Sequence, residues 1–195
     1  MRSMRILLPL SLMTLGAAGI ASGAPATYSI DPDHTHPSFE TDHFGGLSVW
    51  RGIFKKTTGT ITLDKAAQTG SVDVTVDLAS ADLAHDKVNE VVVGPEIFNT
   101  AKYPAAHYRG TLGGFVDGVP TTATGNLTMH GVTKPLDLKV KSFKCMPHPM
   151  YKREVCGADA LGTLHRDEFG IDSGKAYGFN MEVTLRIQVE AINAN

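Results

Sequence analysis

The sequence predicts an all-β protein, an antiparallel barrel of eight strands with one short capping helix. Apolar residues recur at every second position along much of the chain, which is typical of strands buried on one face. Glycine-rich turns separate these runs, and short turns make neighbouring strands antiparallel. Strand pattern alone fits a sandwich as well as a barrel, but small residues at expected inner positions favour a barrel with internal space.

The N-terminal residues 1–26 are predicted to form a secretory signal peptide. Arg2 and Arg5 precede an apolar run over residues 6–18, which is too short to span a bilayer. Ala24-Pro25-Ala26 offers a cleavage site, and residues 21–23 offer a second. We expect cleavage after Ala26 and export to the periplasm, with an uncleaved anchor as the alternative. Residues 27–195 then form a single domain.

The predicted elements follow in chain order. A first strand covers residues 35–43, and short alternating runs include residues 61–63 and 127–129. The alternation is longest in residues 71–78, 136–141 and 181–190. The one credible helix covers residues 86–93 before the Gly94-Pro95 break, with a further turn to Phe98. We expect this helix to cap one end of the barrel.

The expected inner faces contain several small residues. If the strand register is right, they leave volume unfilled, and an eight-stranded barrel has room for one ligand. The alternative is a barrel packed solid by aromatic side chains, which would serve as a partner-binding module. The small inner residues are Thr41, Gly125, Ala158, Ala160 and Gly162.

The two cysteines of the chain, Cys145 and Cys156, flank a turn-rich segment with two prolines. In an oxidising compartment this arrangement favours a disulfide that closes a hairpin. Free thiols or a redox pair are the alternatives, although the spacing is not C-x-x-C.

Composition excludes several classes of function. The formal net charge is -2, whereas nucleic-acid binding requires basic patches. No long apolar segment follows the leader, so we expect no stable membrane insertion. The chain has no G-x-S-x-G, H-E-x-x-H or phosphate-loop motif. We therefore predict that it is not an enzyme and carries no cofactor.

Several motifs together resemble the YceI-like family of polyisoprenoid-binding proteins, over residues 28–192. The resemblance implies a lipocalin-like β-barrel that binds a long apolar, isoprenoid-like lipid. The motifs are Tyr28-Ser29-Ile30-Asp31 followed by His34-Thr35, Phe39 and His43; Asn99-Thr100-Ala101-Lys102-Tyr103-Pro104; the run from Gly125 to Pro135; and Arg166-x-x-Phe169-Gly170-Ile171.

Residues 87–95 depart from the family pattern. Members usually place a charged segment there, whereas this chain has three consecutive valines, Val91 to Val93. The departure makes that end of the barrel more apolar, and it puts any function of the missing polar residues in doubt. The hairpin with Cys145 and Cys156 also looks like a feature of a subgroup of the family rather than of the whole family.

The candidate site is an apolar lining with a polar mouth. Period two from Thr35 places Phe39, Thr41 and His43 on the inner face. His43 and Arg166 are candidates for a lipid headgroup. Alternatively, His43 ties down the following turn, and Arg166 pairs with Asp167, Glu168 or Asp172. The predicted apolar lining is Phe39, Phe44, Leu47, Trp50, Phe54, Val92, Phe98, Leu127, Met129 and Phe169.

The histidines of the first strand define a second functional hypothesis. His34 and His36 share one strand face and, with His43, could serve a metal-dependent or redox-linked envelope protein. No third ligand stands at diagnostic spacing, so we predict outward, solvated histidines and no metal. A homodimer that enlarges the cavity is left open.

Overall fold

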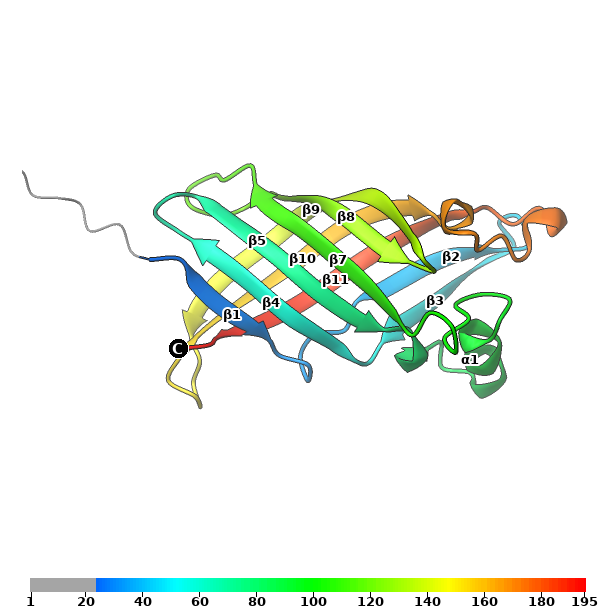
Figure 1. Ribbon diagram of the computed structural model, residues 1–195, viewed down its shortest axis with the longest axis horizontal. Helices are drawn as coiled ribbons and strands as arrows, with labels where there is room; N and C mark the ends of the chain where they lie inside the picture. Colours follow the sequence, from blue (N-terminus) through cyan, green and yellow to red (C-terminus); the bar gives the residue numbers. More distant parts are fainter. Residues whose placement is uncertain (1–23) are drawn as a thin grey trace, which may run out of the picture.

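The computed structural model describes residues 24–195, which form one antiparallel sheet with short helices at one end (Figure 1). The predicted signal peptide lies almost wholly outside the described residues. Its predicted cleavage site adjoins the first strand, in which Ala26 pairs with Leu63. The position of cleavage stays a prediction.

The sheet consists of eleven strand segments. They are β1 (Ala26–Ile30), β2 (Ser38–His43), β3 (Ser48–Phe54), β4 (Thr57–Asp64), β5 (Thr69–Asp77), β6 (Ala81–Asp82), β7 (Ala105–Gly113), β8 (Thr122–Met129), β9 (Val132–Pro147), β10 (Glu154–His165) and β11 (Glu182–Asn193). The helical segments are α1 (Asp86–Val93) and the 3-10 turns η1 (Leu78–Ser80), η2 (Arg166–Phe169) and η3 (Lys175–Tyr177).

These segments make a closed barrel of eight strands, because three barrel strands are interrupted. The strand β11 pairs with β1 along one half and with β2 along the other. The strand β4 continues β3, and β6 continues β5 after η1. Every barrel strand therefore lies between its sequence neighbours, and β1 closes the ring on β11. The predicted eight-stranded antiparallel barrel is confirmed.

Side-chain hydroxyls bridge the backbone at two interruptions. Between β1 and β2, the Thr35 hydroxyl donates to the Glu190 carbonyl and accepts from the Glu190 N–H, both at 3.0 Å. At the next break, the Ser80 hydroxyl accepts from the Lys56 N–H at 3.0 Å. Both side chains are buried, so these bonds satisfy backbone groups that the broken ladder leaves free.

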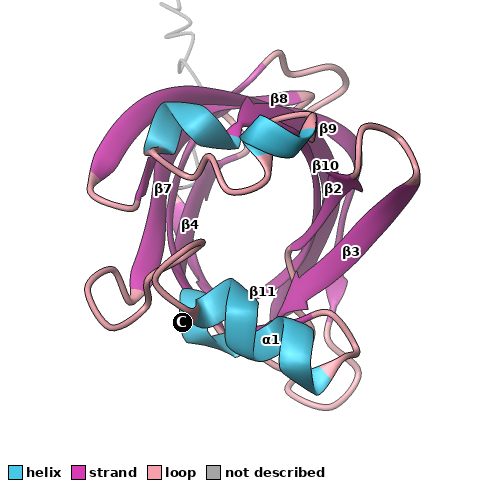
Figure 2. Ribbon diagram, turned by 90° about the vertical axis from the view of Figure 1, so that its right-hand side faces the viewer, coloured by secondary structure: helices cyan, strands magenta, loops and turns pink. Residues whose placement is uncertain are grey.

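The helix α1 has the predicted bounds and lies at the rim of one end, which we call the mouth (Figures 1 and 2). The Asn89 side chain holds it there. Its carbonyl accepts from the Leu83 N–H at 2.7 Å, and its amide donates to Asp82 at 3.0 Å. The turn between β2 and β3 and the segments η2 and η3 lie at the same end. Within residues 24–195, no helix has the length and apolarity needed to cross a membrane.

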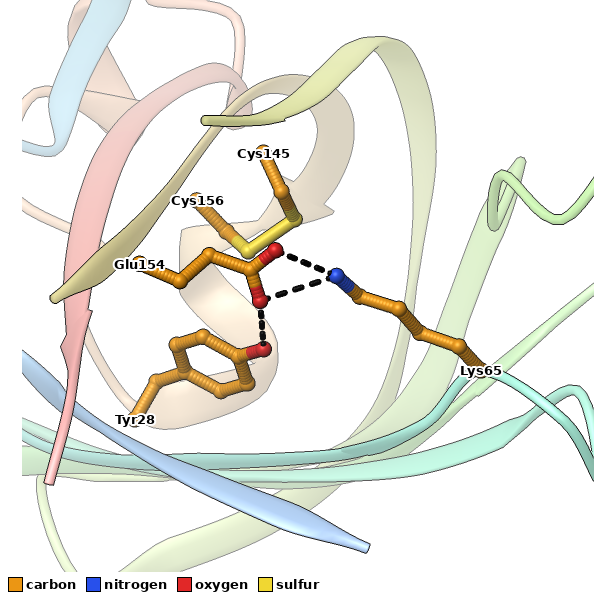
Figure 3. The surroundings of a disulfide bond; sticks show 5 residues. All are labelled: Tyr28, Lys65, Cys145, Glu154 and Cys156. Atoms are coloured by element: carbon orange, nitrogen blue, oxygen red, sulfur yellow. Dashed lines mark hydrogen bonds and ion pairs between the residues drawn. A yellow bond between two sulfur atoms is a disulfide. The ribbon is translucent and has the colours of Figure 1, made fainter. Parts of the chain in front are cut away.

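The opposite end, which we call the closed end, is packed and cross-linked. Cys145 and Cys156 are directly opposed on β9 and β10 and form a disulfide, as predicted (Figure 3). Beside it, Glu154 accepts from the Tyr28 hydroxyl at 2.6 Å and from the Lys65 ammonium at 2.6 and 2.8 Å. Three parts of the barrel wall, β1, the β4–β5 turn and the β9–β10 hairpin, are thereby joined.

The environment of this carboxylate shifts two pKa values in opposite directions. Burial raises the pKa of Tyr28 strongly, and the hydrogen bond to Glu154 adds to the shift. Burial opposes ionisation of Glu154, but hydrogen bonds from Lys65 and Tyr28 outweigh it and hold the pKa of Glu154 below its usual value. The carboxylate therefore stays charged and the phenol neutral at neutral pH.

Candidate functional site: an apolar cavity inside the barrel

The barrel encloses a cavity of about 410 Å³, a volume typical of small-molecule sites. Its wall is almost entirely apolar. The floor is shared with the core of the closed end, through Ile61, Val74, Leu112 and Phe143. The cavity therefore extends from the mouth along most of the barrel to the closed end.

Strand alternation builds the wall. Val72, Val74 and Val76 project inward from β5, and Leu185 and Ile187 project inward from β11. The sequence contained this signal, because these residues alternate with polar ones, but they were not predicted as site residues. Their large, branched side chains leave an apolar surface with few hydrogen-bonding groups.

Most of the predicted apolar residues line the cavity. Three of them form an aromatic cluster, in which the Phe39 ring lies 5.4 Å from Phe54 and 6.3 Å from Phe98. The Phe54 and Phe98 rings are 5.7 Å apart. The predicted residues on the cavity wall are Phe39, Trp50, Phe54, Val92, Phe98, Leu127 and Met129.

Three predicted lining residues lie elsewhere. Phe44 and Leu47 are 53% and 76% exposed in the β2–β3 turn, because the alternation stops where Phe44, Gly45 and Gly46 take positive φ values. Phe169 is only 1% exposed but belongs to η2 and packs in the core outside the cavity wall. Its carbonyl accepts a hydrogen bond from His130 Nδ1 at 3.0 Å.

The small inner residues divide into two groups. Thr41, Ala158 and Ala160 line the cavity, as predicted. Gly125 and Gly162 do not open volume, because neighbours occupy the space of a side chain. A Cβ on Gly125 would lie 2.2 Å from the Arg109 carbonyl oxygen, and one on Gly162 would lie 2.6 Å from Leu138 Cδ2. These glycines permit close packing of the wall.

Two polar residues predicted for a headgroup both reach the cavity at its mouth. His43 lies among aromatic rings, 4.5 Å from Phe44, 5.8 Å from Trp50 and 5.3 Å from Phe179 between centroids. Its Nδ1 is also 3.4 Å from the hydroxyl of Ser48. The alternative role, in which His43 steadies the turn, is therefore supported by its contacts with Phe44 and Ser48.

Arg166 has a structural role that the sequence did not predict. Its guanidinium donates to the carbonyls of Ile171 at 3.2 Å and Ser173 at 2.7 Å, while Asp167 pairs instead with Lys175 at 2.7 Å. The alternative role of Arg166, an ion pair with a neighbouring acid, is therefore replaced by backbone contacts. Its Nε is buried and has no partner within residues 24–195. Burial lowers the pKa of Arg166, and nearby carboxylates, Asp167 first, oppose the shift.

Two hydroxyls on the cavity wall, those of Thr41 and Thr57, have no hydrogen-bond partner among the described residues. Thr57 is 1% exposed. A buried hydroxyl without a partner is costly, so each can hydrogen-bond a polar group of a ligand.

The histidines of the metal hypothesis do not form one cluster. His34 is exposed and contacts Asp31 at 2.9 Å, whereas His43 lies on the cavity wall. Within the described residues, the single group of three potential metal ligands is Cys145, Glu154 and Cys156. The sulfur atoms of that group are bonded to each other.

The fold and the cavity define a class, the closed eight-stranded antiparallel β-barrel with an internal apolar cavity. The chain belongs to the YceI-like family, because the family model described as YceI-like domain matches residues 28–191. Protein YceI of Escherichia coli is 34% identical over 176 residues, which cover 88% of this chain and 89% of the relative. The family resemblance seen in the sequence is confirmed.

Solved structures share the fold. BcnA of Burkholderia cenocepacia has a TM-score of 0.64 at 23% identity, with 83% of this chain and 99% of that chain covered. A protein described as a polyisoprenoid binding domain, from Saccharophagus degradans, has a TM-score of 0.62 at 15% identity, with 86% and 99% covered.

Proposed function

We propose that this protein is a periplasmic carrier that holds a long apolar lipid, isoprenoid-like or a similar amphiphile, inside the barrel for transport, storage or sequestration. The observation that carries the proposal is the cavity of about 410 Å³ with an almost wholly apolar wall. Water gains few hydrogen bonds on such a wall, so an apolar chain is the favoured occupant. The polyisoprenoid-binding description of the Saccharophagus degradans neighbour supports the same ligand class.

The proposal is one of binding rather than catalysis. Burial of apolar area stabilises a complex by about 25 cal/mol per Å² before the costs of association. The cavity wall needs no charged contact for this. At the mouth, His43 and Arg166 are available to a polar headgroup. The cavity argues against the alternative of a solidly packed barrel.

The first experiment is native mass spectrometry of the protein purified from its own envelope, followed by organic extraction. A discrete adduct of long-chain lipid mass is expected, and the extract identifies it. A ligand-free mass that stays unchanged after incubation with isoprenoid alcohols and fatty acids would contradict the proposal. Stoichiometric metal in the same sample would favour the metal hypothesis instead.

A matched pair of variants tests the location of the ligand. Ala158 lies on the cavity wall, whereas Thr163 is exposed on the same strand β10. Ala158→Phe fills part of the cavity and should weaken binding of a fluorescent isoprenoid probe about tenfold or more, since it displaces buried chain. Thr163→Phe should bind the probe as the unmodified protein does. An equal loss of probe binding in both variants would contradict a binding site inside the barrel.

A further inference from the structure

Large apolar side chains gather on the outside of the mouth, and all of them except Val91 lie off the cavity wall. We call this set the apolar rim. All are about half exposed or more, and Leu47 and Tyr177 reach 76% and 77%. They come from the β2–β3 hairpin, α1 and η3, which lie at one end of the barrel (Figure 1). The apolar rim consists of Phe44, Leu47, Val49, Val91 and Tyr177.

The structure holds two parts of the rim together. The Asp42 carboxylate accepts hydrogen bonds from the N–H groups of Gly45, Gly46 and Asn180, at 2.9, 2.6 and 2.8 Å. These bonds join the β2–β3 turn to the loop after η3. The ring of Phe44 lies 4.9 Å from that of Phe179 in the same loop. The turn is thus fixed with Leu47 facing solvent.

The rim is continuous with the cavity. Val91 is 58% exposed and also lines the cavity. Phe179, which contacts Phe44 on the rim, lines the cavity as well. An apolar path therefore runs from the outer surface of the mouth to the interior. Exposed apolar patches of this kind mark interaction sites in soluble proteins.

We infer that the apolar rim docks on the surface of a lipid bilayer, so that the ligand passes between bilayer and cavity without crossing water. The inference rests on the proposed function. A long chain loses its apolar contacts in proportion to its length when it enters water. A rim that enters the interfacial layer of a bilayer removes this barrier. A bilayer is the occupant favoured here because it is also the source of the proposed ligand.

The charges beside the rim indicate which bilayer is preferred. Asp86 and Glu90 lie on α1 with Lys87. Asp167 and Glu168 lie in η2 with Arg166, Asp172 follows η2, and Lys175 lies in η3, so five acidic residues accompany three basic ones. Acidic side chains thus predominate, and they repel anionic lipid. We expect docking to depend on apolar contact, to occur on zwitterionic phosphatidylcholine vesicles, and not to strengthen when anionic phosphatidylglycerol is added.

The test measures flotation of the full protein with phosphatidylcholine vesicles. Trp50, the single tryptophan of the chain, lies on the cavity wall near the mouth and reports docking through quenching by brominated lipid. The test variant, Leu47→Asp with Tyr177→Asp, changes two rim residues outside the cavity wall. The control, Val116→Asp, changes a residue that is 60% exposed in the β7–β8 loop at the closed end.

In the rim variant we expect vesicle binding to fall about tenfold or more and probe transfer from vesicles to slow. Binding of a fluorescent isoprenoid probe added from ethanol should be unchanged. The control should match the unmodified protein in all three measurements. If the unmodified protein binds the free probe but never floats with vesicles, docking is wrong and the carrier proposal stands. Failure to bind the free probe would instead remove the carrier proposal.

Two further results would overturn the inference. Equal loss of flotation in the control would show that the effect is not specific to the rim. The second result is a dimer of the unmodified protein in solution that the double substitution Leu47→Asp with Tyr177→Asp dissociates. If neither the unmodified protein nor this variant binds vesicles, the rim joins two copies of the chain.

Discussion

The two ends of the barrel are built by different means. At the closed end, the disulfide, the Tyr28 phenol and the Lys65 ammonium all meet near Glu154, beside a packed core. At the mouth, backbone hydrogen bonds to Asp42 and Asp82 hold turns whose apolar side chains face solvent. The comparison teaches that the covalent cross-link and the buried carboxylate contacts lie at the end opposite the mouth. The mouth depends on contacts that can open locally.

The largest test of this comparison removes the disulfide. Cys145→Ser with Cys156→Ser should lower the free energy of unfolding by about 3 kcal/mol, because the unfolded chain regains the freedom of the closed loop. Urea denaturation measures this loss. The closed end should lose hydrogen-exchange protection first. A loss of hydrogen-exchange protection confined to the mouth would contradict the comparison between the two ends.

A smaller effect is expected from Tyr28→Phe, which removes a hydrogen bond to a charged carboxylate. The free energy of unfolding should fall by about 2 kcal/mol. The matched control is Tyr108→Phe, since the Tyr108 hydroxyl donates only to backbone carbonyls, of Ala123 and Leu136 at 3.1 Å. A loss of about 1 kcal/mol is expected there. A larger loss for Tyr108→Phe would show that the Glu154 contact adds little.

The smallest expected effect is the loss of stability at low pH. Hydrogen bonds from Asn89, Ala84 and Lys55 lower the pKa of Asp82 from 3.8 to about 2. Its stabilising effect is therefore complete above about pH 4 and is lost as pH falls toward 2. The pKa of Asp42 is lowered in the same sense, chiefly by the Asn180 N–H. Carboxyl NMR titration should show both shifts, and Asp82→Asn should remove the acid-induced loosening of α1.

Much of the barrel could be predicted because its strands follow period two over most of their length. The β9–β10 pair departs from it at one register shift, between Asp159 and Ala160. The alternation from Thr35 to His43 placed the inner residues of β2 correctly. The interruptions of the strands could not be predicted in this way. They depend on bonds such as that between Thr35 and Glu190, which joins residues far apart in the chain.

The errors at the site have the same cause. Phe44 and Leu47 follow directly after a strand whose inner residues were right, but the turn takes the chain out of the pleated geometry. For Arg166, the alternative to a headgroup contact was an ion pair with an acid near it in sequence. The 3-10 turn η2 and the left-handed Gly170 instead bring the backbone of Ile171 and Ser173 to its guanidinium. Composition does not reveal such local geometry.

The pairing of β1 with β11 has a practical consequence. The Ala194 N–H donates to the Thr27 carbonyl at 2.8 Å, so the first and last strands end side by side at the closed end (Figure 1). A protein immobilised through a tag at Asn195 would present its mouth outward, away from the support. Every molecule on a sensor chip would then share one orientation, with the cavity accessible to vesicles flowed over the surface.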